Sequence, residues 1–473
     1  MKPSRDAQTR VLLVMPDGKI NKLKAGRFQL SFREAPLTLT TLASLIPDDL
    51  NIRVYCVDES IQRVPFNRDF DIVGISCMTG TSSRGYEIAR EFRQRGSLIV
   101  VGGVHVTLQP DEARSHADVI FTGFAETTWP RFLSDYRTGS YRSHYHSEGE
   151  SIHGLPAPRR ELQRRFGYMV PNTVAATRGC KGSCHFCSVP AAGYGWSKRS
   201  IGSVIDEIRS IGAKRIVFSD VHLTQEPEYA KELFRAMIPL KKQWGGLAST
   251  RIANDPELLD LMEESGCSYL LIGFESLSDQ SLRLINKGFN RSQTYQCLVE
   301  QLHARNIVIQ GCFMFGFDDD TKQTFSKTVE TINGLGIDIP RFAVFTPYPG
   351  TPAFDRLENE GRLLHKEWYY YDTQHVVFIP QNMTARELDA GLKWSFREAF
   401  KLANNIKRTA KSGKNGPITF LGNLAYKLYV HRLRVDRNRF PAAAIDRIDL
   451  TFPQIRAPRA ESQINAADSG TGR

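Results

Sequence analysis

The sequence lacks the features of a secreted or membrane-spanning protein. Its 473 residues contain no run of about 18 uncharged apolar residues, which argues against a transmembrane helix. Residues 1–15 contain no long apolar core followed by a small-residue cleavage site, so no signal peptide is predicted. We therefore expect a cytoplasmic protein, with peripheral contact at the inner face of the membrane as the alternative.

Cysteine is too scarce and too scattered to build a disulfide scaffold. Of the eight cysteines, five stand alone in the sequence: Cys56, Cys77, Cys267, Cys297 and Cys312. The other three, Cys180, Cys184 and Cys187, fall within eight residues. In a reducing compartment, such a group is typical of a metal site.

Short apolar runs alternate with helical patterns in the first third of the chain. The strand candidates are residues 11–15, 52–57, 72–76, 98–101 and 118–122. Strands that alternate with helices form parallel sheets with helices on both faces. We therefore predict an α/β, doubly wound Rossmann-like domain at residues 9–138, followed by a polar linker at residues 139–165.

A second alternating series predicts a barrel. Its strand candidates are residues 173–177, 215–219, 246–250, 269–274, 308–315 and 341–346. A helical pattern follows each of them, so we predict a partial (β/α)6 barrel of the TIM type over residues 166–365. Barrels of this kind place their chemistry at the C-terminal ends of the strands. The cysteine triplet directly follows the first of these strands.

The remaining residues predict a helical extension and a tail. Thr384 and Glu387 have the spacing of a capping box. The apolar residues that follow share one helix face: Leu388, Leu392, Phe396 and Phe400. We therefore predict a helical domain at residues 366–445. Residues 446–473 are rich in Pro, Ala, Ser, Gly and charge, and are predicted to be disordered.

The cysteine triplet has the ligand types of an iron–sulfur cluster. Thiolates are the usual ligands of a [4Fe–4S] cluster, and four are normally required. Three thiolates leave one iron open to a substrate chelate. A zinc knuckle is the alternative, although zinc normally takes a fourth Cys or His, for which His185 lies nearby in the sequence.

The pattern CxxxCxxC with the aromatic Phe186 resembles the signature of the radical S-adenosylmethionine (SAM) superfamily. The resemblance implies that Cys180, Cys184 and Cys187 hold a [4Fe–4S] cluster. SAM would bind the open iron through its amino and carboxylate groups, and reductive cleavage would give a 5′-deoxyadenosyl radical.

Four further residues resemble SAM-binding positions of that superfamily. Asp220 resembles the acid that holds the amino group of SAM, although Val221 stands where many relatives have a second acid. Glu275 resembles the acid near the ribose and methionine, and Ser249 and Arg251 are candidates for contact with the carboxylate. A loop hydrogen bond or a helix N-cap is the alternative role for each.

Three loops of the first domain resemble those of the cobalamin-binding domain that precedes many radical enzymes. Each follows a predicted strand and carries small residues, which allow the backbone to approach a large flat ligand. The candidate cobalamin-binding residues are Ser76, Met78, Thr79, Gly102, Gly103, Gly123 and Glu126.

One motif departs from that family. Cobalamin folds often carry Asp-x-His-x-x-Gly after the first strand, and its His ligates cobalt. Here Lys19 and Lys22 stand at the His and Gly positions. The resemblance therefore implies cobalamin without a His ligand from this loop, and His105 is the nearest substitute. A domain that has lost its ligand, or that holds a nucleotide, is the alternative.

The two domains together resemble cobalamin-dependent (class B) radical SAM methyltransferases over about residues 9–360, in the subgroup of hopanoid and bacteriochlorophyll methylases. The resemblance implies methylation of an unactivated carbon in a lipid, isoprenoid or tetrapyrrole, with electrons from a reductant such as flavodoxin or ferredoxin. Cyclisation or ring rearrangement without net methylation is the main alternative. A tRNA-modifying enzyme and a non-enzymatic cobalamin-binding regulator are weaker ones. No catalytic side chain is identified, although Cys267, Cys312 and Tyr348 are placed near the barrel mouth.

Positive charge is concentrated near the C-terminus. Residues 401–440 contain ten Lys/Arg and one acid, a balance of +9 within a net charge of +11. A solvated helical face, contact with an anionic membrane surface and nucleic-acid binding are the three interpretations. The lack of extra cluster cysteines in the first domain argues against nucleic acid, because tRNA-modifying relatives have them.

Overall fold

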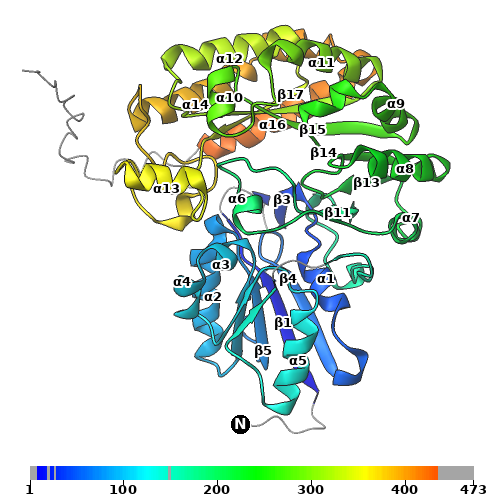
Figure 1. Ribbon diagram of the computed structural model, residues 1–473, viewed down its shortest axis with the longest axis vertical. Coiled ribbons are helices and arrows are strands. Elements are labelled where there is room, and N and C mark those ends of the chain that lie inside the picture. The colour runs from blue at the N-terminus through cyan, green and yellow to red at the C-terminus, as the bar shows by residue number, and fades with distance from the viewer. Residues whose placement is uncertain (1–7, 19–21, 26–27, 148–150, 435–473) are drawn as a thin grey trace, which may run out of the picture.

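The computed structural model describes residues 8–18, 22–25, 28–147 and 151–434. Two bodies are stacked along the long axis, with the first domain below and the barrel with the C-terminal helices above (Figure 1). Lys19 and residues 446–473 lie outside the described residues, so the predictions for them stay predictions. No helix of the described residues is long and apolar enough to cross a membrane.

The first sheet is parallel throughout and confirms the doubly wound prediction. Its strand order is β4-β1-β5-β6-β7-β8, with β1 Thr9–Met15, β4 Ile52–Asp58, β5 Ile72–Ser76, β6 Leu98–Gly102, β7 Val119–Thr122 and β8 His144–His146. Successive residues of β1 pack into separate hydrophobic clusters, Val11 and Leu13 in one and Leu12 in the other. Both faces of the sheet are therefore buried, which explains the uninterrupted apolar strands.

Five helices accompany this sheet: α1 Thr38–Ser44, α2 Ser82–Arg93, α3 Val104–Leu108, α4 Pro110–Arg114 and α5 Thr128–Thr138. The predicted linker is wrong at its start, because β8 within residues 139–165 pairs with β7 as a sixth strand. A strand of three residues is too short for its periodicity to be read from the sequence.

The second sheet confirms the partial barrel. Its strands are parallel and follow chain order: β10 Thr173–Val174, β13 Arg215–Phe218, β14 Gln243–Ala248, β15 Cys267–Glu275, β16 Val308–Phe315 and β17 Ile339–Val344. The helices between and after them are α7 Ile201–Ser210, α8 Pro227–Met237, α9 Pro256–Glu264, α10 Asp279–Leu284, α11 Tyr295–Ala304 and α12 Lys322–Leu335. The predicted first strand is shorter than expected, because the chain leaves the sheet after Val174.

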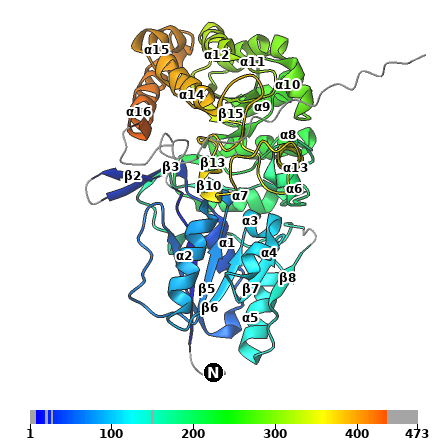
Figure 2. The same cartoon turned by 90° about the vertical axis from the view of Figure 1, so that its left-hand side faces the viewer.

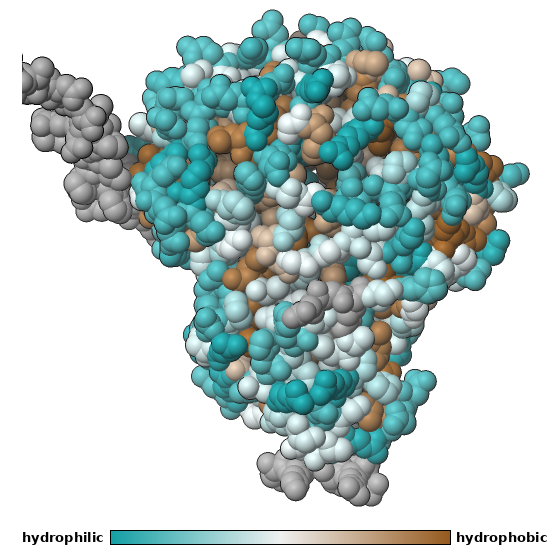
Figure 3. Space-filling model, viewed as in Figure 1, coloured by the Kyte–Doolittle hydropathy of each residue, from teal (hydrophilic) through white to brown (hydrophobic). Residues whose placement is uncertain are grey.

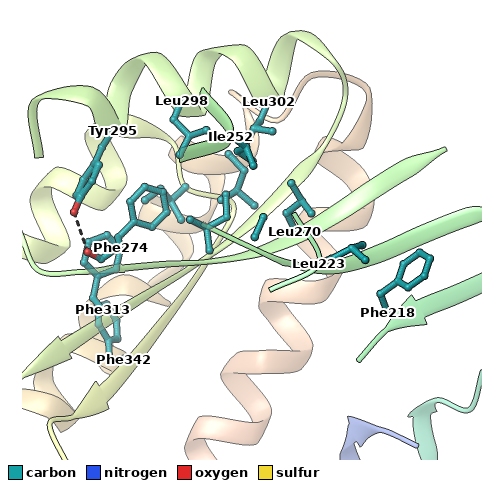
Figure 4. Packing of buried hydrophobic residues seen from close by; sticks show 14 of the residues in the cluster. Phe218, Leu223, Ile252, Leu270, Phe274, Tyr295, Leu298, Leu302, Phe313 and Phe342 are labelled. Atoms are coloured by element: carbon teal, nitrogen blue, oxygen red, sulfur yellow. Dashed lines mark hydrogen bonds between the residues drawn. The ribbon is translucent and has the colours of Figure 1, made fainter. Parts of the chain in front are cut away.

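Only one face of the barrel strands packs against the helices. Along β16, Ile309, Phe313 and Phe315 are buried, whereas Gln310 and Cys312 on the opposite face are partly exposed. The buried face forms the main core, where Phe274 stacks on Phe313 at 5.4 Å between ring centroids and accepts a hydrogen bond from Tyr295 through its backbone oxygen (Figure 4). The concave face is left accessible to a ligand.

A small third sheet, not predicted from the sequence, joins the two bodies. The hairpin of β2 (Lys22–Ala25) and β3 (Phe28–Glu34) comes from the first domain, and β9 (Tyr168–Val170) enters the barrel. Strands β3 and β9 are parallel neighbours, and the Tyr168 hydroxyl donates to the Asp58 carboxylate at 2.8 Å. The bodies are thus connected by backbone pairing as well as by the chain.

The C-terminal helices are α13 Pro352–Asn359, α14 Ala385–Ala399, α15 Leu402–Thr409 and α16 Gly416–Arg434. The capping box is confirmed, since Thr384 and Glu387 exchange hydrogen bonds of 2.8 and 3.2 Å between backbone and side chain. The predicted apolar face of α14 is buried. Between residues 366 and 384, all of which the structure describes, the one helix is the three-residue η8 (Trp368–Tyr370). The long helices of the predicted domain therefore begin only with α14, later than predicted.

Candidate functional site

The cysteine loop lies between β11 (Thr177–Arg178) and α6 (Ser188–Ala191), directly after the first barrel strand. Strand β11 pairs antiparallel with β12 (Ser197–Lys198), which closes the loop at its base. Gly179 has a φ of +73°, and a Cβ there would lie 2.1 Å from the Gly195 oxygen, so this turn requires glycine. The three thiols of the loop are free and partly exposed.

These thiols suit ligands that bind separate irons. Within the described ranges, no three or more His, Cys, Asp or Glu side chains gather as they would around one metal ion. His185, the zinc alternative's fourth ligand, instead points Nδ1 at the Leu284 oxygen, 3.0 Å away. Burial raises the pKa of the Cys184 thiol, and that of the Cys187 thiol to about 11. Iron binding would therefore release protons from both thiols.

The Asp220 carboxylate stabilises the backbone just before this loop. Its carboxylate is 2% exposed and accepts hydrogen bonds from the backbone N–H groups of Ala176 and Thr177, and from the Thr177 hydroxyl at 2.6 Å. Burial raises the pKa of Asp220 to about 6. The predicted contact with the SAM amino group stays a prediction, and the contacts of this carboxylate in the structure are with the chain itself.

A hydrogen-bonded series links Ser249 to the first cysteine. The Ser249 hydroxyl lies 3.2 Å from His222 Nε2, and His222 Nδ1 lies 3.0 Å from Gln225 Oε1. That amide oxygen also accepts from the Cys180 thiol at 3.2 Å and from the Lys181 backbone N–H at 3.1 Å. Because Gln225 Oε1 can only accept, His222 carries its proton on Nδ1 and accepts from Ser249 through Nε2.

Sequence reasoning missed both His222 and Gln225. Burial lowers the pKa of His222, so the ring is neutral at neutral pH, as this hydrogen-bonding pattern requires. Both residues follow Asp220 within five positions, on the loop after the second barrel strand. Their position at a strand end is the signal that could have identified them.

Glu275 ends β15 next to the cysteine loop. It has a φ of +67°, lies at an irregularity in the pairing with β16, and is 8% exposed. Its carboxylate forms an ion pair with Lys287, which the sequence analysis did not identify. Burial alone would lower the pKa of Lys287, but Glu275 outweighs it and the pKa is raised. The pair therefore keeps both charges in a buried position.

The other two predicted residues of the barrel differ in exposure. Arg251 is exposed and lies over the ring of Phe289, with its guanidinium carbon 4.2 Å from the ring centroid. Phe186 is partly buried and packs at the edge of the main core, 6.4 Å from Phe345 between centroids. Contact of either residue with SAM stays a prediction.

The candidate cobalamin loops all follow the C-terminal ends of the first sheet. Ser76 ends β5, Gly102 ends β6, and Gly123 follows β7. Gly123 has a φ of +78°, and a Cβ there would lie 1.9 Å from the Ser147 oxygen. Of the neighbouring candidates, Met78 is 46% exposed, whereas Thr79 is 2% exposed.

Glycine at position 103 and a glutamate complete this set. Gly103 has a φ of +99°, and a Cβ there would lie 2.6 Å from the Cys77 oxygen. Glu126 Oε2 is buried and has no hydrogen-bond partner among the residues that the structure describes. An acceptor of this kind fits the amide groups around a corrin ring, so the residues present fit cobalamin.

The last candidate cobalamin loop contacts the strand that leads into the cysteine loop. Glu126 forms an ion pair with Arg178, two residues before Cys180. The Arg178 guanidinium also lies 4.8 Å from the centroid of Phe124, whose ring stacks on Tyr194 at 4.6 Å. The two candidate sites therefore share one boundary.

His105 is not placed as a cobalt ligand. It is fully buried, and its Nε2 lies 3.2 Å from Glu112, which also accepts from the Trp368 indole N–H at 2.6 Å. Cys267 begins β15 and so lies at the opposite end of the strand from the barrel mouth. Cys312 lies on the concave face of β16.

Comparison with known proteins identifies the same two domains, the first domain and the barrel. A model described as the Radical SAM superfamily matches residues 174–332, and one described as the B12 binding domain matches residues 34–133. The bacteriochlorophyllide d C-12(1)-methyltransferase of Chlorobaculum tepidum is 33% identical over 356 residues, which are 72% of this chain and 76% of the relative. The C-8(2)-methyltransferase of the same organism is 28% identical over 364 residues, 72% of this chain and 80% of the relative.

Among solved structures, the radical SAM methyltransferase TsrM from Kitasatospora setae, determined with cobalamin and a [4Fe–4S] cluster, has a TM-score of 0.59 at 18% identity. The match covers 75% of this chain and 78% of that one. At this identity the likeness shows a shared fold of both domains.

Proposed function

The chain belongs to the cobalamin-dependent radical SAM methyltransferases, and on that premise we propose that it methylates a flat tetrapyrrole at an unactivated carbon. As a member of this family it uses a [4Fe–4S] cluster, SAM and cobalamin, as the sequence predicts. The observation that carries the proposal is the contact between the two sites, through Glu126 and Arg178.

Each part of the site has a proposed task. Cys180, Cys184 and Cys187 hold the cluster, while Asp220 fixes the backbone from which their loop begins. When bound, the cluster supplies one electron to SAM and cobalamin supplies the methyl group.

The remaining side chains are proposed to position SAM and the corrin ring. Glu275 and Lys287 place a compensated pair of charges beside the cluster loop, where SAM would lie. Ser249 and Arg251 are proposed to meet the SAM carboxylate at the end of β14. The loops with Gly102, Gly103 and Gly123 bring the first domain close to the corrin ring.

A tetrapyrrole is favoured by two observations. The two bacteriochlorophyllide methyltransferases align over 72% of this chain, which includes both domains. On the concave face of β15 and β16, Tyr269, Gln310 and Cys312 are partly exposed beside Leu271 and Met314, so a wall of mixed polar and apolar side chains borders the barrel interior. A lipid or isoprenoid is the rival substrate class.

Two partners complete the proposal. A one-electron reductant such as flavodoxin or ferredoxin would supply the cluster, because reductive cleavage consumes an electron. Residues 401–440 are proposed to contact a membrane, where apolar pigments and lipids are found. The described part of this segment consists of α15, α16 and their connection.

The test uses the anaerobically reconstituted holoenzyme, dithionite and methyl-labelled SAM, with tetrapyrroles and isoprenoid lipids as candidate substrates. We expect a labelled tetrapyrrole and release of 5′-deoxyadenosine. Cys180→Ser should abolish both, whereas Cys297→Ser, at an exposed cysteine far from the loop in sequence, should not. A labelled lipid alone would reject the tetrapyrrole, and an unlabelled cyclised product would reject methyl transfer.

A further inference from the structure

Helices α15 and α16 present large aliphatic side chains to solvent. Leu402 is 56% exposed, Ile406 53%, Leu421 63% and Leu424 43%. Leu402 and Ile406 are four residues apart on α15, and Leu421 and Leu424 are three apart on α16, so each pair lies on one side of its helix. We call these four residues the aliphatic face.

The two halves of the aliphatic face meet at an open groove. Its walls are formed by Ile406 and Thr409 of α15, by Ala410 directly after that helix, and by Gly416, Pro417, Phe420 and Leu421 of α16. No charged side chain lines it. Figure 2 shows both helices at the outer edge of the upper body, with α16 running down toward the hairpin of β2 and β3. The opposite face in Figure 3 is mostly hydrophilic on its helices.

The aliphatic face is anchored firmly to the barrel. Arg408 is fully buried and donates hydrogen bonds to Asn333 at 2.6 Å and Asn423 at 3.1 Å. Tyr426 stacks on Phe400, with ring centroids 5.1 Å apart. Arg408 and Tyr426 thus point inward, whereas the four residues of the aliphatic face are left outside.

The segment that carries the aliphatic face is rich in positive charge. Residues 401–434 contain eight Lys/Arg and no Asp or Glu. Lys407, Lys414 and Lys427 are exposed, and none forms an ion pair with another residue that the structure describes. Exposed aliphatic side chains and exposed lysines on the same two helices and their connection are the combination that binds the boundary between anionic headgroups and acyl chains.

We propose that the aliphatic face docks on an anionic lipid bilayer, with Ile406 and Leu421 inserted and the lysines on the headgroup phosphates. Nucleic acid is disfavoured, because its binding surfaces rely on cations and stacking aromatics rather than exposed leucines. A second copy of the chain is disfavoured as well, since it would bring the same positively charged segment against this one. This proposal rests on the membrane contact proposed above and names the surface that makes it, while its test is independent of the reaction and the substrate.

The test measures co-flotation of the full holoenzyme with vesicles of phosphatidylcholine, alone or with phosphatidylglycerol. The first variant is Ile406→Asp/Leu421→Asp, and its control is Met169→Asp, because Met169 is 62% exposed on β9. The second is Lys407→Glu/Lys414→Glu, with Lys214→Glu as control at another exposed lysine. Far-UV circular dichroism and thermal unfolding establish that each variant is folded.

We expect the wild-type protein to bind the anionic vesicles but not the neutral ones. The bound fraction should fall at high salt, because salt screens the charges. Each double variant should lower the partition coefficient about ten-fold or more, since one lysine at such a surface contributes roughly a factor of five. Both controls should bind as wild type does. Absence of wild-type binding at low salt would overturn the proposal, and so would unchanged binding of folded Ile406→Asp/Leu421→Asp. Self-association or RNA binding that these same variants abolish, without vesicle binding, would assign the surface to that partner instead.

Discussion

Arg178, two residues before Cys180 of the cysteine loop, forms an ion pair with Glu126 on the last of the candidate cobalamin loops. The two residues are 52 positions apart in the chain and belong to different domains. The pair connects the part of the protein that generates the radical to the part that carries the methyl group. Its geometry therefore bears on how well the two steps are coupled.

Replacing Glu126 with Gln is expected to lower labelled methyl transfer by roughly ten- to a hundred-fold, because small displacements of reacting groups cost that much. Cleavage of SAM should fall less, so the ratio of 5′-deoxyadenosine to methylated product rises. The control is Arg93→Ala, which breaks an exposed 3.1 Å ion pair with Asp118 inside the first domain. An unchanged ratio in Glu126→Gln would contradict a coupling role.

Replacing His222 with Ala is expected to loosen the loop that carries Cys180. The ring bridges Ser249 and Gln225, and Gln225 Oε1 accepts from the backbone N–H of Lys181, next to Cys180. Loss of such supporting contacts typically costs about 10–100-fold in metal affinity or activity. Iron release to a chelator, followed by absorbance, should accelerate accordingly. His153→Ala, at an exposed histidine, should release iron at the wild-type rate.

Removing Lys287 should destabilise the barrel. Lys287→Met leaves the Glu275 carboxylate buried without its partner, which typically costs about 3–5 kcal/mol. Urea unfolding should show this loss. The double variant Glu275→Gln/Lys287→Met should recover part of it, because no unpaired charge remains. Equal stability of the single and double variants would show that the ion pair is not the cause.

Stability should fall between pH 4 and pH 7 through Asp320. Burial raises the pKa of this carboxyl to about 7, while it accepts hydrogen bonds from the Gly316 and Phe317 backbone at 2.8 and 3.0 Å. The unfolded carboxyl has a pKa of about 4, so in this range the folded state binds more protons and its advantage is lost as pH rises.

The contribution from Asp320 is at most about 4 kcal/mol, from three pH units at 1.36 kcal/mol each. Urea unfolding from pH 4 to pH 8 measures it. Asp320→Asn keeps an acceptor for both N–H groups but does not titrate, so its stability should vary less with pH. A variant that follows the wild-type pH profile would assign the dependence to other groups.

The sequence predicted the strands of both main sheets well because their signals are local. Residues 308–315 and 72–76 form strands with the predicted bounds. Residues 72–76 are an apolar run buried on both faces, whereas residues 308–315 alternate between partly exposed and buried positions. Strands β8 and β9 were missed, because each has three residues and is stabilised by a partner distant in sequence.

The same distinction between local signals and distant partners applies to the candidate site. The cysteine triplet is a motif of eight residues, and its place after the first barrel strand follows from strand order. The ion pair partners of Glu126 and Glu275 could not be predicted, because nothing in the local sequence distinguishes Arg178 or Lys287 from other cations. Asp220 was correctly placed at a strand end, but only the folded chain shows its carboxylate directed at the backbone of residues 176 and 177.

The pairing of β3 with β9 also constrains how the protein is made. Glu34 ends β3 and Tyr168 begins β9, which is 134 positions later (168 − 34). At translation rates of about 5–20 residues per second, the ribosome needs roughly 7–27 seconds to add the missing strand. During that time β2 covers one edge of β3 and the other edge has no partner strand. A first domain released before residue 168 should therefore self-associate through that edge, whereas the full chain covers it from within.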